Sequence, residues 1–178
     1  MAKDEPRVNL DCEVRHYQLK DDGTFPNSYL PVLLYKNALR IPTFFGAHFI
    51  KKLFASNNWV HTWRSGIFTY HHYHSITHEA LGAYKGKATI QIGGDAGVKV
   101  LLEKGDVLLI PAGVSHKNLG KENSIRCVGA YPDGKDPDMN YGKANERPRA
   151  DKNIYALQLP SKDPVFGIDG KMQQFWKL

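Results

Sequence analysis

The sequence predicts an all-β domain, either a barrel or a sandwich of short strands, with one substantial helix. Three observations indicate this class: short apolar β segments follow one another closely, glycine-rich turns separate them, and no β-α-β alternation typical of a parallel sheet occurs. The turns at 93–95 and 104–106 place glycine where a tight turn requires a positive φ angle. The segments that we predict as strands in this region are 60–63, 67–73, 80–85, 88–92, 98–102, 107–110 and 124–131.

The segment before this region predicts a further pair of β segments and the helix. Residues 13–19 (EVRHYQL) have the composition of a strand, and turn-forming residues then interrupt the pattern before the apolar run at 32–35. Between positions 43 and 56, apolar side chains recur at helical spacing, which predicts a helix near 44–56. We expect its apolar stripe to pack over the barrel or against a second subunit.

The composition changes after Pro132, where prolines, glycines and charged residues become frequent. This composition predicts a mostly extended tail, in which 155–159 is a candidate edge strand and Phe175 and Trp176 are anchors on the body of the protein. We expect one domain over 1–178, because a chain of this length forms a single core. Its barrel core would span about 58–131, between an N-terminal extension at 1–57 and a C-terminal extended tail at 132–178.

The composition is that of an ordinary globular protein, with 42% hydrophobic and 24% charged residues. The formal net charge is +6, but Lys51 and Lys52 are the only adjacent basic pair, and the other basic residues alternate with acidic residues and glycines. We therefore expect no nucleic-acid partner. The positive balance slightly favours an anionic small molecule as ligand.

Two cysteines, Cys12 and Cys127, are present and do not form a CxxC pair, so neither a zinc knuckle nor a disulfide framework is expected. The opening MAKDEPRVNL has no apolar stretch of the kind that a signal peptide needs, and no segment has the apolar length of a membrane span. We expect a cytoplasmic protein, without membrane contact, in which both thiols stay reduced.

Four of the eight histidines lie in the segment YHHYHSITHE at 70–79. On a strand alternate side chains share a face, so His72 and His74 point the same way while His71 points the opposite way. A break near position 75 would return the Glu79 carboxylate toward this pair, and a third imidazole, His116, follows the turn at 111–113.

The predicted metal ligands are His72, His74, Glu79 and His116. Three imidazoles and one carboxylate suit borderline divalent ions such as Fe²⁺, Mn²⁺, Ni²⁺, Co²⁺ or Zn²⁺. In an octahedral complex this ligand set leaves two positions open for substrate, water or dioxygen, and the ion can then act as a Lewis acid or as a template.

The spacing of these residues resembles the two sequence motifs of the cupin superfamily. The first motif, G-x5-H-x-H-x4-E-x6-G, is matched throughout by Gly66, His72, His74, Glu79 and Gly86. The second, G-x5-P-x-G-x2-H-x3-N, is matched by Gly105, Pro111, Gly113 and His116. It departs from the motif at the last position, where Gly120 replaces the asparagine and Asn118 lies two residues earlier.

The chain is similar to the small, functionally uncharacterised YjlB-like single-domain cupins in HHYHSITHE, in the early FPN and LPVLLY segments, and in the late YPDG and DMNYG segments. This resemblance implies a cupin-type jelly-roll β-barrel with one or few short helices. It implies no established reaction, and a fold does not by itself define a function.

Two further residues near the ligands are catalytic candidates. Tyr70 shares the predicted face of the ligands, where a phenol can orient a substrate or act as an acid, although an inward aromatic that fills the barrel is an equal alternative. His78 would face away on a regular strand, so we interpret it as a hydrogen-bonding neighbour of the site rather than a ligand. Polar residues that we consider for the pocket mouth or for a loop over it are Lys117, Asn118, Arg126, Tyr131, Asp138, Asn140 and Tyr141.

The sequence leaves two main functions open. The first is a metal-dependent enzyme of the dioxygenase or isomerase type that acts on a small oxygen-rich or anionic metabolite. The alternative is a non-catalytic protein that binds or senses a small molecule through the metal. A third reading, a dimerisation platform with a purely structural ion, is less favoured because the ligand set is open. Sheet edges and terminal aromatic residues also predict a homodimer.

Overall fold

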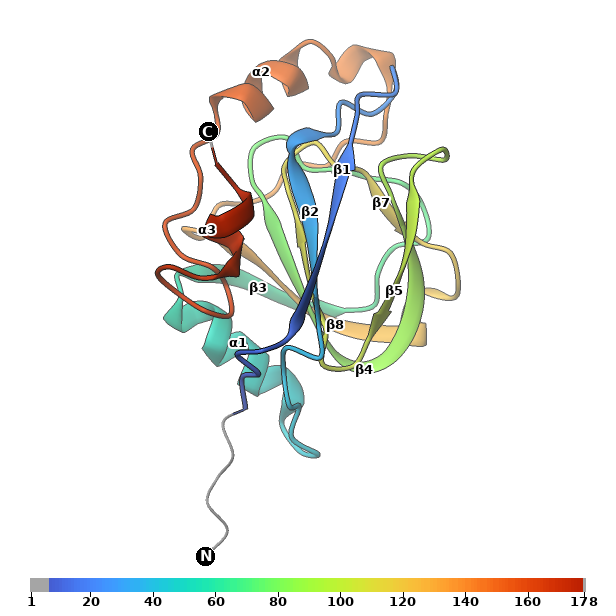
Figure 1. Ribbon diagram of the computed structural model, residues 1–178. Coiled ribbons are helices and arrows are strands. Elements are labelled where there is room, and N and C mark those ends of the chain that lie inside the picture. The colour runs from blue at the N-terminus through green and yellow to red at the C-terminus, as the bar shows by residue number, and fades with distance from the viewer. Residues whose placement is uncertain (1–6, 178) are drawn as a thin grey trace, which may run out of the picture.

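Eight antiparallel strands form the body of the protein, which the computed structural model describes over residues 7–177 (Figure 1). The strands are β1 (Glu13–Leu19), β2 (Ser28–Lys36), β3 (Trp59–Ser65), β4 (Glu79–Ile92), β5 (Val98–Glu103), β6 (Val107–Ile110), β7 (His116–Asn118) and β8 (Ile125–Pro132). The helices are α1 (Gly46–Ser56), α2 (Arg149–Ala156) and α3 (Lys171–Phe175), with 3-10 turns η1 (Glu122–Ser124) and η2 (Ala144–Glu146). The predicted all-β class is therefore confirmed.

Strand β4 belongs to both halves of the barrel. Its first half pairs with β6 and β8 within the order β1-β2-β6-β4-β8-β3, and its second half pairs with β5 and β7. Most neighbours in this order are not consecutive in the chain, as in the crossed connections of a jelly roll. The bend between the halves lies at Gly86, whose φ of +76° favours glycine and where a Cβ atom would lie 2.2 Å from the Ser124 carbonyl oxygen. The expected jelly-roll barrel is confirmed.

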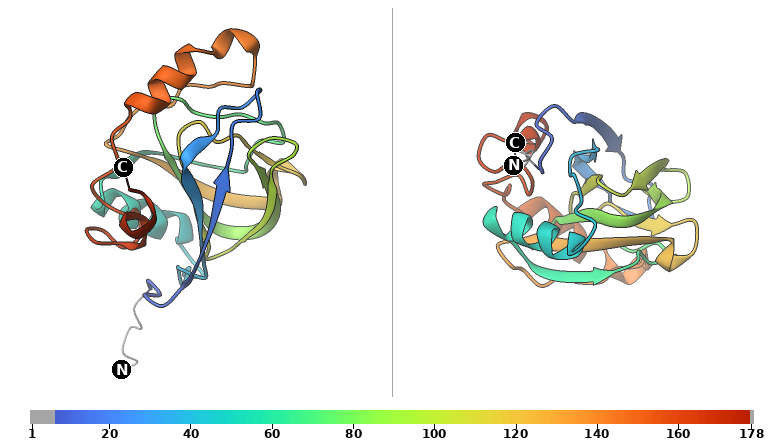
Figure 2. Two further views of the ribbon diagram at one scale, coloured as in Figure 1. Left: turned by 45° about the horizontal axis from the view of Figure 1, so that its top comes forward. Right: turned by 90° about the horizontal axis from the view of Figure 1, so that it is seen from below.

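Both faces of β2 are buried, which explains its continuous apolar run. Val32 and Leu34 belong to the core inside the barrel, whereas Leu33 and Tyr35 belong to a second core on the outer face of the sheet. The second core is covered by α1 and the C-terminal segment. Figures 1 and 2 show α1 and α3 on one side of the barrel, opposite β5.

The helix predicted near 44–56 is confirmed as α1, which packs on the barrel. Its buried side chains Ala47, Ile50 and Phe54 face the sheet. A Cβ atom at Gly82 on β4 would lie 2.7 Å from Ile50 Cγ2, so the glycine permits the close approach of the helix. Within residues 7–177 no helix has the length and apolar character that are needed to cross a bilayer.

The prediction of a mostly extended tail at 132–178 was wrong in part, because residues 149–156 form α2 and no strand forms at 155–159. Arg149, Ala150 and Lys152 are strong helix formers, and Asp151 lies in the first turn, where a carboxylate stabilises a helix. The predicted anchor Trp176 is confirmed, since its side chain is buried and its Nε1 donates to the Pro31 carbonyl at 2.8 Å.

The predicted strand at 67–73 was also wrong. Residues 66–78 form an extended loop with isolated bridges between His72 and His116 and between Tyr73 and Asn140. The predicted strands 80–85 and 88–92 form the single strand β4. The short strand β7 was not predicted. The backbone of 66–78 hydrogen-bonds to single residues from separate parts of the chain rather than to a continuous neighbouring strand.

Candidate metal centre

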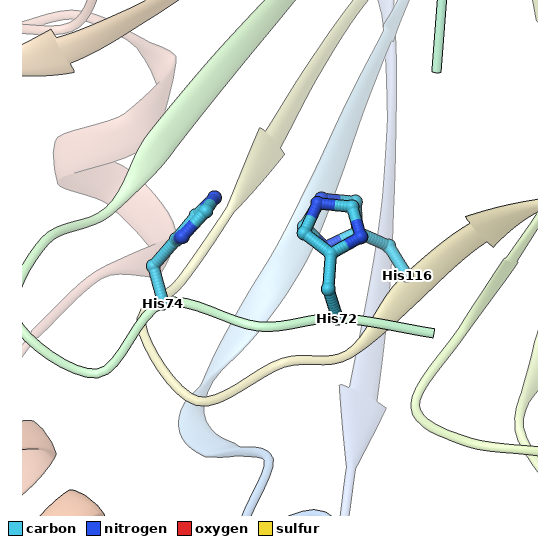
Figure 3. Close-up of side chains that lie close together, drawn as sticks. All are labelled: His72, His74 and His116. Carbon is cyan, nitrogen blue, oxygen red and sulfur yellow. The ribbon is translucent and has the colours of Figure 1, made fainter. Parts of the chain in front are cut away.

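Three imidazoles meet at one end of the barrel interior (Figure 3). His72 and His116 exchange backbone hydrogen bonds of 3.3 and 3.0 Å, which place their rings 4.2 Å apart, and His74 is held on the same loop two residues later. One nitrogen atom from each of the three side chains lies within 4.8 Å of the others, and all three residues are buried. Such a cluster could hold a metal ion.

The predicted alternation of faces is confirmed, although the loop is not a strand. His71 points away from the cluster, toward Phe25 at a ring distance of 5.2 Å and toward Asp95 at 3.3 Å. Tyr73 also points away and donates its hydroxyl to Glu146 at 3.1 Å. An extended backbone alternates its side chains even without a continuous neighbouring strand.

Glu79, the fourth predicted ligand, lies at the first position of β4 beside two of the three imidazoles. Its Oε2 is 3.4 Å from His74 Nε2 and 3.3 Å from His116 Nε2. Its Oε1 accepts hydrogen bonds from Tyr131 at 2.9 Å and from Trp63 Nε1 at 3.2 Å. The carboxylate is thus fixed through one oxygen, while the other, which is buried without a hydrogen-bond partner, faces the imidazoles. This orphaned oxygen fits a bound cation.

The three imidazoles share one arrangement of ring nitrogens. The Nδ1 atoms of His72, His74 and His116 lie 3.4, 2.6 and 3.3 Å from backbone carbonyl oxygens of Tyr70, Asp138 and Val114. A carbonyl only accepts, so each neutral ring must carry its proton on Nδ1, which leaves the Nε2 lone pair available. The donor set therefore fits a metal ion that is bound by three Nε2 atoms and one carboxylate oxygen.

Burial and mutual charge set the protonation of the cluster. Burial would raise the pKa of Glu79, but His74 and His116 hold that pKa well below its usual value. Burial, assisted by His116, lowers the pKa of His72 to about 3. Burial lowers the pKa of His74 as well, but Glu79 outweighs this effect and the pKa is raised. The carboxylate is thus ionised and His72 is neutral at neutral pH, as metal ligands must be.

The 138–140 segment holds the loop of residues 66–78, the histidine loop, in place. The Asp138 carboxylate accepts from Ser75 N at 2.6 Å and from Ser75 Oγ at 2.5 Å. Asn140 exchanges backbone hydrogen bonds of 2.9 and 3.0 Å with Tyr73. The sequence indicated this segment only as a loop near the opening. Its orienting role was missed because it depends on a contact across more than 60 residues of chain.

His78 supports the turn before His116 and does not line the cavity. Its Nδ1 accepts from Ala112 N at 3.0 Å, and its buried ring lies 4.8 Å from that of Trp176. Gly113, in the same turn, has a φ of +92° and a Cβ atom there would lie 2.1 Å from the Asn27 carbonyl oxygen. The interpretation of His78 as a hydrogen-bonding residue agrees with this contact. A catalytic role for it stays a prediction.

Tyr70 lies at the outer rim rather than inside the barrel. It is 46% exposed, and its ring stacks on Phe68 at 4.9 Å and lies 6.0 Å from that of Tyr141. The alternative of an aromatic that fills the barrel is therefore wrong. A role of Tyr70 toward a substrate stays a prediction.

A cavity of about 260 Å³ opens onto the histidine cluster. It is lined by Trp63, Ser65, Gly66, Ile67, Phe68, His72, His74, Glu79, Leu81, His116, Tyr131 and Met139. Of the polar candidates for the mouth, Tyr131 lines it, whereas Lys117 pairs with Asp95 and Arg126 contacts Asn123 outside it. The sequence missed Trp63 and Met139, because strand pairing and the chain path after β8 bring them to the cavity.

Asn118 lies two residues before the position at which the sequence departs from the second motif. Its side chain accepts from Gly120 N at 2.8 Å and donates to the Lys121 carbonyl at 2.9 Å. The Asn118 side chain thus stabilises the turn after β7 by bonding two backbone groups of that turn, and it does not line the cavity.

A jelly-roll barrel with three imidazoles and a carboxylate at one end of its interior is the architecture of a cupin. No family model matches the sequence. The uncharacterised protein YjlB of Bacillus subtilis (strain 168) is 38% identical over 168 residues, which cover 94% of this chain and 99% of YjlB. The chain belongs to the YjlB family.

Two solved structures match this chain over shorter stretches. A vicilin from Solanum melongena is 24% identical over 45% of this chain, with a TM-score of 0.35, and the matched part is 24% of the vicilin. A DUF861 family protein from Thermotoga maritima is 23% identical over 52% of this chain and 92% of its own, with a TM-score of 0.31.

Proposed function

We propose that the protein binds one divalent transition metal ion through His72, His74, His116 and Glu79. The observation that carries this proposal is a cluster of three buried imidazoles, two of which direct Nε2 at the free oxygen of the buried Glu79 carboxylate. Neutral imidazoles and one carboxylate suit Fe²⁺, Mn²⁺, Ni²⁺, Co²⁺ or Zn²⁺. The fixed Nδ1 hydrogen bonds and the two donors on Glu79 Oε1 support the ligand geometry before an ion arrives.

The favoured activity is that of a metal-dependent enzyme of the dioxygenase or isomerase type, acting on a small oxygen-rich or anionic metabolite. The ion would supply Lewis acidity or a template for the substrate. The chain's own contribution is to hold the ligands, to orient Glu79 through Tyr131 and Trp63, and to exclude water with the apolar wall of the cavity.

One observation favours the alternative of a binding or sensing protein. Among the described residues that line the cavity, Tyr131 is the one titratable side chain besides the four proposed ligands. Burial and Glu79 raise the pKa of Tyr131. No separate general base lies beside the cluster within residues 7–177. Dioxygen uptake that depends on added Fe²⁺, or isomerisation of a bound substrate, would establish the enzyme; metal-dependent binding without product would establish the sensor.

Metal content tests the proposal directly. Protein purified without added metal should contain close to one transition ion per chain by elemental analysis. His72→Ala and His116→Ala should lose it at neutral pH, because each removes a ligand. His71→Ala is the matched control and should retain it, because its side chain faces Phe25 and Asp95. An empty His71→Ala protein beside a full His72→Ala protein would overturn the ligand assignment.

We also propose a homodimer, supported by apolar side chains that residues 7–177 leave uncovered. Phe44 and Phe45 before α1 are 75% and 82% exposed, and single chains rarely leave adjacent aromatic side chains in water. Sedimentation should give the mass of two chains in wild-type protein and a lower mass in Phe45→Ser. A mass of one chain that does not change with concentration would contradict the dimer.

A further inference from the structure

We infer that the ligand of this site has a single chelating end, which carries its only charge, and a compact apolar body. This inference rests on the proposed metal site and concerns the part of the ligand that does not touch the ion. It narrows the oxygen-rich or anionic metabolite that the sequence suggests.

The wall around the metal cluster is apolar. Trp63 from β3, Leu81 from β4, and Ile67 and Phe68 from the histidine loop line the cavity, and Met139 from the 138–140 segment lies at its mouth. Ile67 is 3% and Leu81 1% exposed, so these side chains are fixed in the packed barrel. Such a wall stabilises an apolar group of a ligand by removing it from water.

The polar groups of the wall are already engaged. Trp63 Nε1 donates to Tyr131 at 2.8 Å and to Glu79 at 3.2 Å, and the Tyr131 hydroxyl donates to Glu79 at 2.9 Å. The imidazoles direct Nδ1 to backbone carbonyls and Nε2 to the cluster. Ser65 is the one remaining polar side chain among the described residues of the wall. A second polar group on the ligand would lose its water for few new hydrogen bonds.

No lysine or arginine belongs to the cavity wall within residues 7–177. Arg64, Lys85 and Arg126 line a different groove, on the outside of the barrel, and Lys117 pairs with Asp95. A second carboxylate on a bound ligand would therefore be buried without a counter-ion, which is strongly unfavourable. The basic residues that give the chain its formal charge of +6 therefore do not line this cavity within residues 7–177.

The volume sets the size of the apolar body. An apolar cavity of about 150 Å³ accommodates benzene, and this one measures about 260 Å³. A single ring or a branched chain of similar size, with a two-oxygen head at the ion, fits this volume. The stacked rings of Phe68 and Tyr70 lie at the rim, where they would contact such a body.

Three acids that share a 2-hydroxycarboxylate head test the inference: glycolate has no body, mandelate has a phenyl body, and malate has a second carboxylate. Their affinities for Zn²⁺-loaded and metal-free protein would be measured by calorimetry, so no turnover is needed. We expect mandelate to bind the loaded protein at least about tenfold more tightly than glycolate, because its ring is removed from water. Malate should bind no more tightly than glycolate.

A charge placed at the mouth should change this preference. Met139→Lys introduces a cation at a cavity residue that is 39% exposed, so the fold should tolerate it. We expect the affinity for malate relative to mandelate to rise about tenfold. Leu119→Lys is the matched control, since Leu119 is 42% exposed and does not line the cavity, and its affinity ratio should stay that of the wild type.

The outcomes separate this inference from the metal site. If all three acids bind in a metal-dependent way but mandelate gains nothing over glycolate, or malate binds most tightly to the wild type, the apolar-body inference is wrong and the metal site stands. An unchanged malate-to-mandelate ratio in Met139→Lys would also overturn it. If the protein retains the added Zn²⁺ but no acid binds it more tightly than the metal-free protein, the ligand inference is wrong and the metal site stands. If the protein retains no Zn²⁺, the proposed metal site itself fails.

Discussion

Each imidazole of the cluster has its proton position decided by one backbone carbonyl. The carbonyls belong to Tyr70, Asp138 and Val114, which lie in three separate parts of the chain, yet all accept from Nδ1. A backbone acceptor cannot be removed by a side-chain substitution. The ligand geometry should therefore tolerate changes of nearby side chains better than changes of the ligands themselves.

Glu79→Gln tests the one charged ligand. The amide oxygen can replace Oε1 as the acceptor of Tyr131 and Trp63, so the fold should be retained, but the amide nitrogen then faces the imidazoles and cannot coordinate. We expect metal affinity to fall by more than about hundredfold. This loss exceeds the one expected when a residue that only hydrogen-bonds a metal ligand is removed. Chelator competition measures the loss. Tyr131→Phe, which removes only a hydrogen bond to Glu79, should cost about ten- to hundredfold, and equal losses in the two variants would contradict the ligand role.

His78 makes the stability of the protein depend on pH. Burial lowers its pKa to about 4, whereas the unfolded chain has the ordinary value of about 6.5. The unfolded state therefore binds more protons between these values, and the free energy of unfolding falls as pH decreases from about 6.5 to about 4, by roughly 3 kcal/mol. Below about 4 this contribution is constant.

His78→Gln removes that titration. Denaturant unfolding of metal-loaded wild type and variant at several pH values should show a shallower loss of stability between pH about 6.5 and 4 for the variant. Parallel curves would show that His78 does not carry the effect. The sequence identified this residue as a neighbour of the ligands, but its burial against Trp176 depends on the path of the C-terminal segment.

Among the elements, the histidine loop depends most on a distant partner. Residues 66–78 contain no regular strand. Hydrogen bonds of Ser75 and Tyr73 attach the loop to the 138–140 segment. Asp138→Ala removes the acceptor of Ser75 N and Ser75 Oγ while the carbonyl facing His74 remains. We expect metal affinity to fall about ten- to hundredfold and the amides of the loop to exchange faster.

Asp136→Ala is the control for that substitution. Asp136 lies two residues away, and its side chain is 82% exposed. It contacts the half-exposed His61 at 2.9 Å. Metal affinity and amide exchange in the loop should stay unchanged. If both variants behave alike, the carboxylate of Asp138 has no specific role in ordering the loop.

Local signals predicted the elements well where the neighbours were continuous strands. β1, β5, β6 and β8 lie within one residue of their predicted bounds, because alternation and glycine turns are properties of adjacent residues. The same signals failed at 66–78 and at β7, where pairing is limited to a few residues from elsewhere. They also missed α2, whose charged sequence in a proline-rich region resembled a solvated tail.

The four proposed ligands could be proposed from the sequence because they lie at the spacing of a known motif. The residues that hydrogen-bond to these ligands follow no such spacing, so the sequence does not indicate them.

For the whole molecule, a buried carboxylate helps to fasten the C-terminal segment to the sheet, together with the Trp176 anchor. Asp163 is 0% exposed and accepts from Tyr35 at 2.7 Å and from the backbone of Val165, Phe166 and Met172 at 2.7, 3.0 and 2.8 Å. Asp163→Ala leaves these donors buried without an acceptor. We expect a loss of more than about 3 kcal/mol in the free energy of unfolding, measured with denaturant.

Asp169→Asn is the matched control in the same segment. Asp169 is exposed and has a φ of 58°, a conformation that asparagine also tolerates. Its free energy of unfolding should stay within about 0.5 kcal/mol of the wild type. A similar loss in both variants would show that the segment as a whole, rather than the carboxylate, is responsible.

The contact between His74 and the Asp138 carbonyl also determines when the site can form during synthesis. The His74 imidazole and the Glu79 carboxylate are synthesised long before the groups that orient them, because Tyr131 and the Asp138 carbonyl follow more than 50 positions later. A nascent chain that ends before position 138 has the histidines but not the finished geometry. We therefore expect the proposed ion to be bound in its final geometry only by a nearly complete chain.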